Sequence, residues 1–387
     1  MKDYKRLGDY IREVNIRNRE LEVTNPMGIN INKHFMPSVA NVIGTDLSTY
    51  KLVSKMQFAC NLMHVGRDEK IPMAMHTEDN PITVSSAYFV FEVINTDQLL
   101  PEYLMMWFRR PEFDRNAWFY TDADVRGGMG KESFLDMQLP IPSITRQREI
   151  VAEYETLTRR IRINEQMIQN LESTAQTLYR KMFVDGIDKE NLPDGWRMGT
   201  LGEVCEINTD NISSKEKLEE IKYLDSSSVT ENIFEKYQSL NPCTDEIPSR
   251  AKRKVRCNDI VYSTVRPNLK HFGIIKGNVS NVVVSTAFAV IRSNNINISN
   301  ELLYLLLTEN HNTEILQGIA EMSKATYPSI TPENIIDLKI VMPKQINNAF
   351  IDLNRQLKLI FNCISTTHIE NQKLTELQSL LLAKMGQ

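Results

Sequence analysis

Two stretches of the chain carry apolar residues at alternating steps of three and four, sustained over about five heptads. In the first stretch Asn164 fills the one gap in a series of apolar seam positions, which are Ile150, Tyr154, Leu157, Ile161, Ile168, Leu171, Ala175, Leu178 and Met182. In the second stretch the same register is kept by Leu353, Leu357, Ile360, Ile364, Leu374 and Leu381, with Thr367, Asn371 and Gln378 at its polar positions. Such a repeat is typical of helices that pair along a seam. We therefore expect two long paired helices; the alternative is two ordinary amphipathic core helices.

Short alternating runs separated by turn signals precede each long helix. Residues 282–284 and 288–291 have the pattern of strands, whereas 101–108 and 301–307 have the pattern of helices. A Leu-Pro-Ile-Pro segment that ends at Pro142 leads into the first long helix, with Ser143 as its expected N-cap. The fold class predicted is mixed α and β.

The chain repeats itself at a spacing of about 200 residues. The matching segments are 7–11 with 201–205, 85–91 with 285–291, 103–104 with 304–305, Pro142 with Pro343, and 181–182 with 384–385. Because these matches keep their order, the two halves should share one fold, and their helices should pair antiparallel about a pseudo-two-fold axis. The predicted domains are 1–142, then 143–190 with the first long helix and a linker, then 191–343, and 344–387 with the second long helix.

Charge is concentrated in one segment of the second half. The net charge is only −4, with 42% apolar and 24% charged residues, so the total does not by itself indicate a nucleic-acid partner. Between Glu246 and Lys276, however, only Glu246 and Asp259 oppose the cations Arg250, Lys252, Arg253, Lys254, Arg256, Arg266, Lys270 and Lys276. Arginine and lysine suit DNA phosphates, arginine also suits guanine, and asparagine suits adenine. We expect DNA contact from this segment; the alternative is a solvated charged face.

The loop at 263–271 holds Arg266, Asn268 and Lys270 between two strand-like runs. Other candidate loops are 61–70 and 124–131 in the first half and 322–328 in the second. Their candidate DNA-binding residues are His64, Arg67, Arg126, Lys131, Lys324 and Tyr327. A turn that only caps a strand is the alternative interpretation for each of these loops.

Motifs for catalysis, nucleotide binding and metal binding are missing from the sequence. The segment Gly127–Lys131 fails the phosphate-loop pattern, and HExxH and GxSxG do not occur. The five cysteines form no CxxC pair, so neither a zinc site nor a disulfide framework is expected. The N-terminus is polar and no apolar run is long enough to span a membrane, which predicts a cytoplasmic protein.

Several segments resemble specificity subunits of type I restriction-modification systems. The resemblance rests on the duplicated layout, on 139–143 leading into 147–151, on 44–51, 57–59, 63–68 and 121–129 in the first half, and on 259–270 in the second. It covers essentially the whole chain.

This resemblance implies two target recognition domains, each reading one half of a bipartite DNA site. It also implies that the paired helices dock two methyltransferase subunits, which would bind S-adenosylmethionine and methylate adenine. Restriction subunits, where present, would add ATP- and Mg-dependent translocation and cleavage. This chain would have no catalytic residue, metal or cofactor of its own. The alternatives are a coiled-coil scaffold with protein-binding ends and a stand-alone nuclease or methyltransferase.

Overall fold

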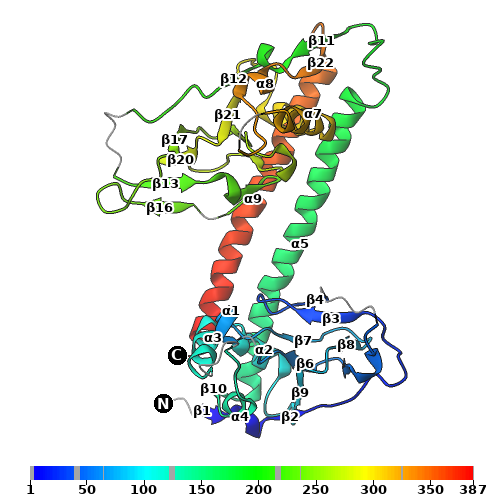
Figure 1. Ribbon diagram of the computed structural model, residues 1–387, viewed down its shortest axis with the longest axis vertical. Helices are drawn as coiled ribbons and strands as arrows, with labels where there is room; N and C mark the ends of the chain where they lie inside the picture. Colours follow the sequence, from blue (N-terminus) through cyan, green and yellow to red (C-terminus); the bar gives the residue numbers. More distant parts are fainter. Residues whose placement is uncertain are drawn as a thin grey trace. The chain divides into compact units, whose positions relative to one another are not determined.

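The structure is a computed structural model that describes residues 4–38, 44–63, 65–121, 127–213, 219–235, 237–323 and 326–386, and only the main chain of Arg67. Contacts divide the chain into two units (Figure 1). The first unit comprises Met1–Ile163 and Asn371–Gln387, and the second comprises Asn164–Glu370. Each unit therefore contains one half of the repeat together with parts of both long helices.

The first unit is built on two four-stranded sheets. Its strands are β1 (Tyr4–Arg6), β2 (Ile11–Glu13), β3 (Pro26–Ile29), β4 (Phe35–Pro37), β5 (Lys51–Val53), β6 (Phe58–Cys60), β7 (Met73–Met75), β8 (Ile82–Val84), β9 (Phe89–Val93) and β10 (Gln138–Pro140). Its short helices are α1 (Val65–Asp68), α2 (Pro101–Phe108), α3 (Pro111–Phe119) and α4 (Lys131–Leu135). One sheet has the order β2-β9-β6-β7, the other β4-β3-β8-β5, and β1 pairs with β10. All of these pairings are antiparallel except that of β3 with β8.

The second unit repeats this topology and adds one two-stranded antiparallel sheet, β14-β15. Its strands are β11 (Trp196–Thr200), β12 (Cys205–Ile207), β13 (Ile221–Leu224), β14 (Val229–Thr230), β15 (Ile233–Phe234), β16 (Gln238–Leu240), β17 (Ala251–Lys254), β18 (Ile260–Ser263), β19 (Phe272–Ile274), β20 (Val282–Ser285), β21 (Phe288–Ser293) and β22 (Lys339–Pro343). Its short helices are α6 (Asn300–Leu307), α7 (Asn310–Glu321) and α8 (Pro332–Ile336). The sheets have the orders β12-β21-β18-β19 and β16-β13-β20-β17, again with one parallel pairing, β13 with β20. The predicted duplication of fold is confirmed.

Alternating side chains place the antiparallel sheet of each unit between two cores, as the period of a strand requires. In β6, Phe58 and Cys60 face the helices, whereas Ala59 packs with Val84 against the other sheet. The aromatic rings of Phe58 and Phe91 stack with their centroids 4.9 Å apart.

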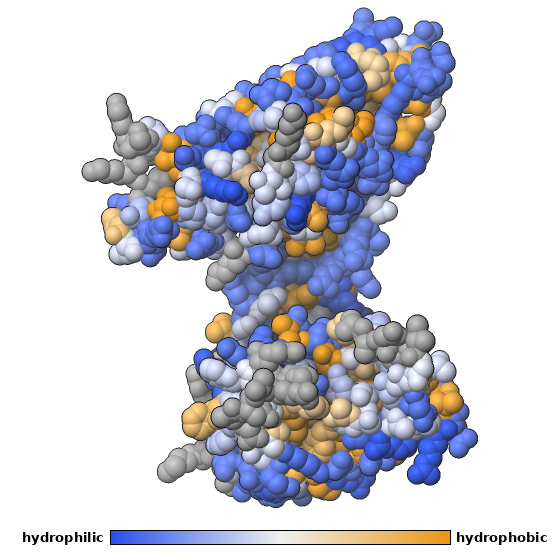
Figure 2. Space-filling view, viewed as in Figure 1, coloured by the Kyte–Doolittle hydropathy of each residue, from blue (hydrophilic) through white to orange (hydrophobic). Residues whose placement is uncertain are grey.

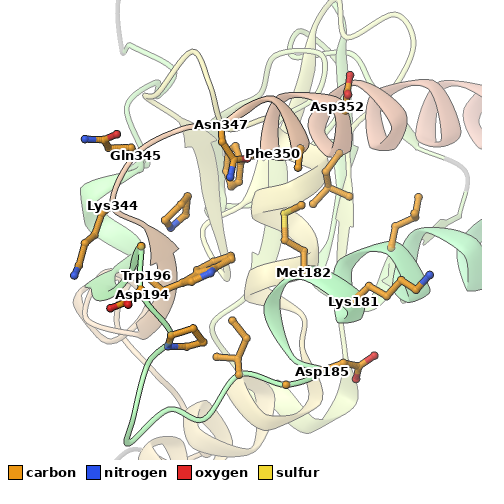
Figure 3. A pocket seen from close by; sticks show the side chains of 18 of the residues that line it. Lys181, Met182, Asp185, Asp194, Trp196, Lys344, Gln345, Asn347, Phe350 and Asp352 are labelled. Carbon is orange, nitrogen blue, oxygen red and sulfur yellow. Dashed lines mark hydrogen bonds between the residues drawn. The ribbon is translucent and has the colours of Figure 1, made fainter.

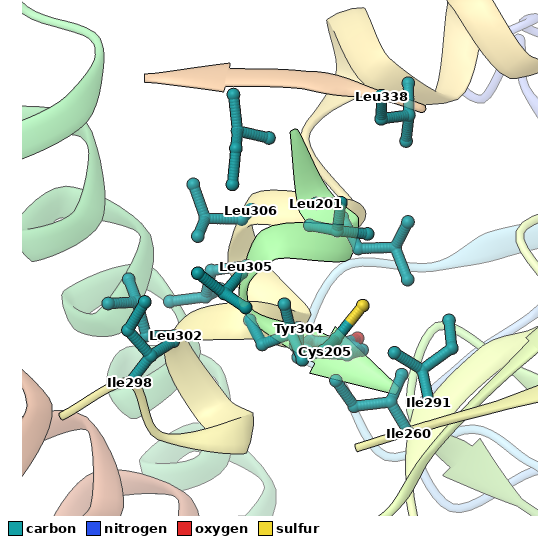
Figure 4. Close-up of a cluster of buried hydrophobic side chains, with 14 of the residues drawn as sticks. Leu201, Cys205, Ile260, Ile291, Ile298, Leu302, Tyr304, Leu305, Leu306 and Leu338 are labelled. Atoms are coloured by element: carbon teal, nitrogen blue, oxygen red, sulfur yellow. The ribbon is translucent and has the colours of Figure 1, made fainter. Parts of the chain in front are cut away.

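The equivalent core of the second unit has aliphatic side chains at these two positions. Ile260 and Ile291 occupy the positions of the two stacked rings, and they lie with Leu302 and Leu306 of α6 in one cluster (Figure 4). The same strand pairing therefore forms around different side chains.

The long helices are α5 (Ile144–Phe183) and α9 (Asn348–Lys384), and they run antiparallel within each unit. In the first unit, Gln378 Nε2 donates to Thr158 Oγ1 at 2.7 Å, and the core cluster that contains Tyr154 also contains Met385. In the second unit, Asn164 Nδ2 donates to Glu370 Oε2 at 3.1 Å. The predicted helix pair is confirmed.

The predicted seam positions are buried or half-buried. Those buried are Tyr154, Ile168, Ala175, Leu353, Leu357 and Ile364; those half-buried are Ile150, Leu157, Ile161, Leu171, Leu178, Met182, Ile360, Leu374 and Leu381. The seam is not the only buried face of α9, because Phe361 lies outside the seam positions and shares a buried core with α6. The first half of α9 is therefore a domain core helix as well as a pairing helix.

Candidate nucleic-acid interface

Two loops meet at one end of the antiparallel sheet in the second unit. Loop A follows β18 and comprises residues 264–271; loop B follows α7 and comprises residues 322–331. The N–H of Ile330 donates to the carbonyl of Thr264 at 2.8 Å, and the N–H of Arg266 donates to the carbonyl of Pro328 at 2.9 Å. Main-chain hydrogen bonds thus join two candidate segments that lie about 60 residues apart in sequence.

The first unit contains an equivalent pair, with loop A at residues 61–72 and loop B at 120–130. The N–H of Met129 donates to the carbonyl of Leu62 at 2.8 Å, and the N–H of Gly66 donates to the carbonyl of Gly127 at 2.7 Å. A Cβ added at Gly66 would lie 2.7 Å from the Cα of Gly127, so only glycine allows this approach. The loops predicted separately from the sequence therefore lie together in both units.

Arg266 and Tyr327 form the exposed face of the second loop pair. The guanidinium carbon of Arg266 lies 5.2 Å from the centroid of the Tyr327 ring, which is 58% exposed. Stacking on a ring holds the guanidinium plane and leaves its N–H edge available for a planar acceptor. Asn268 is exposed beside it, and its own N–H is fixed by Gln317 Oε1 of α7 at 3.1 Å.

Lys270 is oriented differently from Arg266. Its Nζ lies 2.8 Å from Glu231 Oε1, and both residues line a cavity of about 590 Å³ with Glu172 and Glu309. Burial raises the pKa of the Glu172 carboxyl, and the charge of Glu231 raises it further. Because Lys270 is already paired with Glu231, the surface of Arg266 and Tyr327 is the better candidate for a DNA-facing side.

Acids from other parts of the chain neutralise much of the basic segment. Arg256 pairs with Asp210 at 2.8 Å, and Lys276 pairs with the buried Glu301 at 2.8 Å. Asp259 binds the guanidinium of Arg292 through both of its carboxylate oxygens. Arg292 was not among the cations that the sequence indicated. The cationic surface is therefore smaller than the sequence count suggests.

The cations of the edge strand β17 are the remaining part of that surface. Arg250 and Lys252 are exposed. Arg253 is half-buried, its Nη1 has no hydrogen-bond partner among the described residues, and burial lowers its pKa. Of these three candidates, Arg250 and Lys252 are the ones that phosphates can approach.

The first unit offers fewer described cations at its loops. Lys131 begins α4, pairs with Glu13, and lies 5.1 Å from the centroid of the Phe89 ring. Of the other candidate residues, His64, Arg126 and Lys324 lie outside the described residues, as does the side chain of Arg67.

Exposed apolar side chains beside the loops were missed from the sequence. Trp118, Phe119 and Tyr120 end α3 and lead into loop B of the first unit, and all three are exposed. The sequence feature that could have indicated this surface is the run of three aromatic residues ahead of a polar loop. On the face drawn in Figure 2, orange patches of hydrophobic residues lie among polar ones.

A cavity of about 1030 Å³ lies in the second unit between the end of α5, β11 and the start of α9. Figure 3 shows Trp196 and Met182 within it, with Lys344 and Asp194 toward one end and Lys181 and Asp185 toward the other. Within the described part of the chain, no three His, Cys, Asp or Glu side chains are grouped to hold a metal ion. No helix in that part is both long and apolar enough for a membrane crossing.

The duplicated topology and its loop pairs agree with known proteins of one class. Residues 193–379, in the second half of the chain, match the model of the type I restriction modification DNA specificity domain. A stretch of 162 residues is 29% identical to the type I restriction enzyme HindI specificity subunit of Haemophilus influenzae. That stretch covers 41% of this chain and 34%, about a third, of that subunit.

The fold extends the likeness over the whole chain. The crystal structure of the type I restriction-modification system S subunit from M. genitalium matches with a TM-score of 0.62 at 12% identity, covering 100% of this chain and 96% of that one. This likeness shows that the two chains share a fold. The resemblance to specificity subunits of type I restriction-modification systems is confirmed by the family model over residues 193–379 and by the match to the HindI subunit.

Proposed function

We propose that this chain reads a split DNA sequence, with one half-site read by the loop pair of each unit. The observation that supports this most is that the same two loops are joined by main-chain hydrogen bonds at the same end of the same sheet in both units. A bipartite site is the natural target of such a duplicated reader, since each copy can carry its own side chains on one scaffold.

Side chains on the second loop pair suit base and phosphate contacts. Arg266, whose guanidinium carbon lies 5.2 Å from the centroid of the Tyr327 ring, can donate two parallel N–H groups to a guanine edge, and Asn268 can pair with an adenine edge. Arg250 and Lys252 can neutralise phosphates and set the register without reading sequence. This division assigns specificity to loop A and much of the salt-dependent affinity to β17.

Catalysis belongs to partner subunits in this proposal. The paired helices α5 and α9 dock two methyltransferase subunits that bind S-adenosylmethionine and methylate adenine within the site. Restriction subunits, where the system has them, contribute the ATP- and Mg-dependent cleavage. The chain itself directs these enzymes to DNA in the cytoplasm and performs no chemistry.

The test is single-molecule sequencing of DNA from cells that express this chain with the methyltransferase encoded beside it, and from cells that express each alone. Adenine methylation at one split motif, present only with both proteins, is the expected result. The alternative is a stable complex that leaves DNA unmethylated and whose affinity for DNA does not depend on the salt concentration. That result would support the protein-binding scaffold instead.

A further inference from the structure

Two very exposed apolar side chains occupy equivalent positions in the two units. Phe119 at the end of α3 is 80% exposed, and Met322 directly after α7 is 85% exposed. Burying a side chain of either type is worth about 1.5–3 kcal/mol, so a partner that covers either of them gains about that much.

The equivalence follows from the buried faces of the two helices. Phe113 and Ala117 are the buried anchors of α3, and Leu316 and Ala320 are those of α7. The same number of residues separates Phe113 from Leu316, Ala117 from Ala320, and Phe119 from Met322. The turn that follows is also the same, because Tyr120 N–H donates to the carbonyl of Ala117 and Ser323 N–H donates to that of Ala320.

Both side chains adjoin the loop pairs. Helix α3 contacts α1 of loop A in the first unit, and α7 contacts the turn at Pro267–Leu269 of loop A in the second. In the first unit, Thr121 forms a bridge with Met129, whose N–H donates to Leu62. Phe119 therefore lies two residues from a ladder that joins both loops.

We propose that Phe119 and Met322 are apolar wedges that contact base pairs, one in each half-site, next to the loops that read them. This inference rests on the proposed function and adds a contact that carries no charge. Phenylalanine and methionine are among the side chains that proteins insert between base steps, where they partly unstack and kink the duplex. The flanking Trp118 and Tyr120 widen this apolar surface in the first unit.

The chemistry predicts a distinctive energetic signature. Removing a side chain that stacks on a base should weaken DNA binding by about 10-fold, within the range found for base–aromatic stacking. Because no phosphate contact is lost, the slope of affinity against salt concentration should stay unchanged. Each substitution should affect only its own half-site.

The experiment uses the complex with the methyltransferase and duplexes that carry the methylated motif. 2-Aminopurine is placed at successive positions of both half-sites, avoiding the methylated adenine, whose own flipping by the methyltransferase would also raise fluorescence. In the unsubstituted complex, fluorescence should rise at one step in each half-site. Phe119→Ala should abolish the rise in one half-site and Met322→Ala the rise in the other, whereas Phe119→Leu should retain it.

Ile94→Ala and Ile296→Ala are matched controls, because both isoleucines are exposed and follow the ends of β9 and β21 remote from loop A. Unchanged fluorescence and affinity in the Phe119 and Met322 variants would overturn the wedge while leaving the split-site function intact. Loss of complex assembly by these variants would also overturn it, in favour of a protein contact. Failure of the unsubstituted complex to bind a split site would overturn the proposed function itself.

Discussion

Substituting Gly66 with alanine should open the loop pair of the first unit without unfolding the unit. The added Cβ would lie 2.7 Å from the Cα of Gly127, whereas carbon atoms in contact normally lie about 3.5–4.0 Å apart. The two backbones must then separate by about 1 Å. The hydrogen bond from Gly66 N–H to the carbonyl of Gly127, now 2.7 Å, would be lost or weakened.

Two terms set the magnitude. Overpacking of this kind costs about 1–3 kcal/mol, and the lost hydrogen bond adds about 0.5–1.5 kcal/mol. Since loop A and loop B are surface segments, the strain is relieved by local opening, and the melting temperature should change little. If DNA binding requires the closed pair, the loops must close again on binding, at a free-energy cost of about 2–4 kcal/mol. This cost weakens the affinity for DNA by roughly 30- to 1000-fold.

The assay is DNA binding by the complex with the methyltransferase, with substrates altered in one half-site at a time. Gly128→Ala is the control, since its Cβ would meet nothing nearer than 3.8 Å. Discrimination should fall in the half-site of the first unit only. Equal affinity of the Gly66→Ala and Gly128→Ala complexes would refute the requirement for closed loops.

Three further outcomes are expected. Lys33→Met should destabilise the first unit by about 3–5 kcal/mol in urea unfolding, because it leaves Asp114 buried without the ammonium that now lies 2.6 Å away. The double variant that also carries Asp114→Leu should recover most of this stability. Arg266→Ala should weaken binding and relax one base position, whereas Lys270→Ala, which removes an already paired charge, should change affinity little; equal effects would contradict the assignment of the DNA-facing side. Deleting one heptad from each long helix, a rise of about 10 Å, should shorten the preferred spacer by roughly three base pairs, as sequencing of methylated sites would show, and an unchanged spacer would count against helix length as the determinant.

The elements that the sequence predicted best are those with a strong period. The helix expected at 101–108 is α2 with those bounds, and the strand expected at 282–284 lies within β20. Both elements could be predicted because the burial of a helix or strand sets the spacing of apolar residues along it, and that spacing can be read from one sequence.

The charge surface was predicted less well for a physical reason. Ion pairs form between residues distant in sequence, so the partners of Arg256 and Lys276, which are Asp210 and Glu301, cannot be recognised by counting charges within a segment. The exposure of Met322 was hidden for a related reason. A methionine after a helix is ordinary in sequence, and only the packing of α7 shows that this one is exposed.

Main-chain hydrogen bonds explain how one scaffold can present two different reading surfaces. The bonds from Met129 to Leu62 and from Ile330 to Thr264 hold the loops at equivalent places, and neither depends on the side chains involved. Side chains at the loop tips can therefore differ between the units without loss of the fold. The first unit adds a glycine–glycine approach and the second adds Arg266 on Tyr327, so each copy closes its loops in its own way. Under the proposed function, a duplicated chain built like this can change one half of its recognised sequence while the other half stays the same.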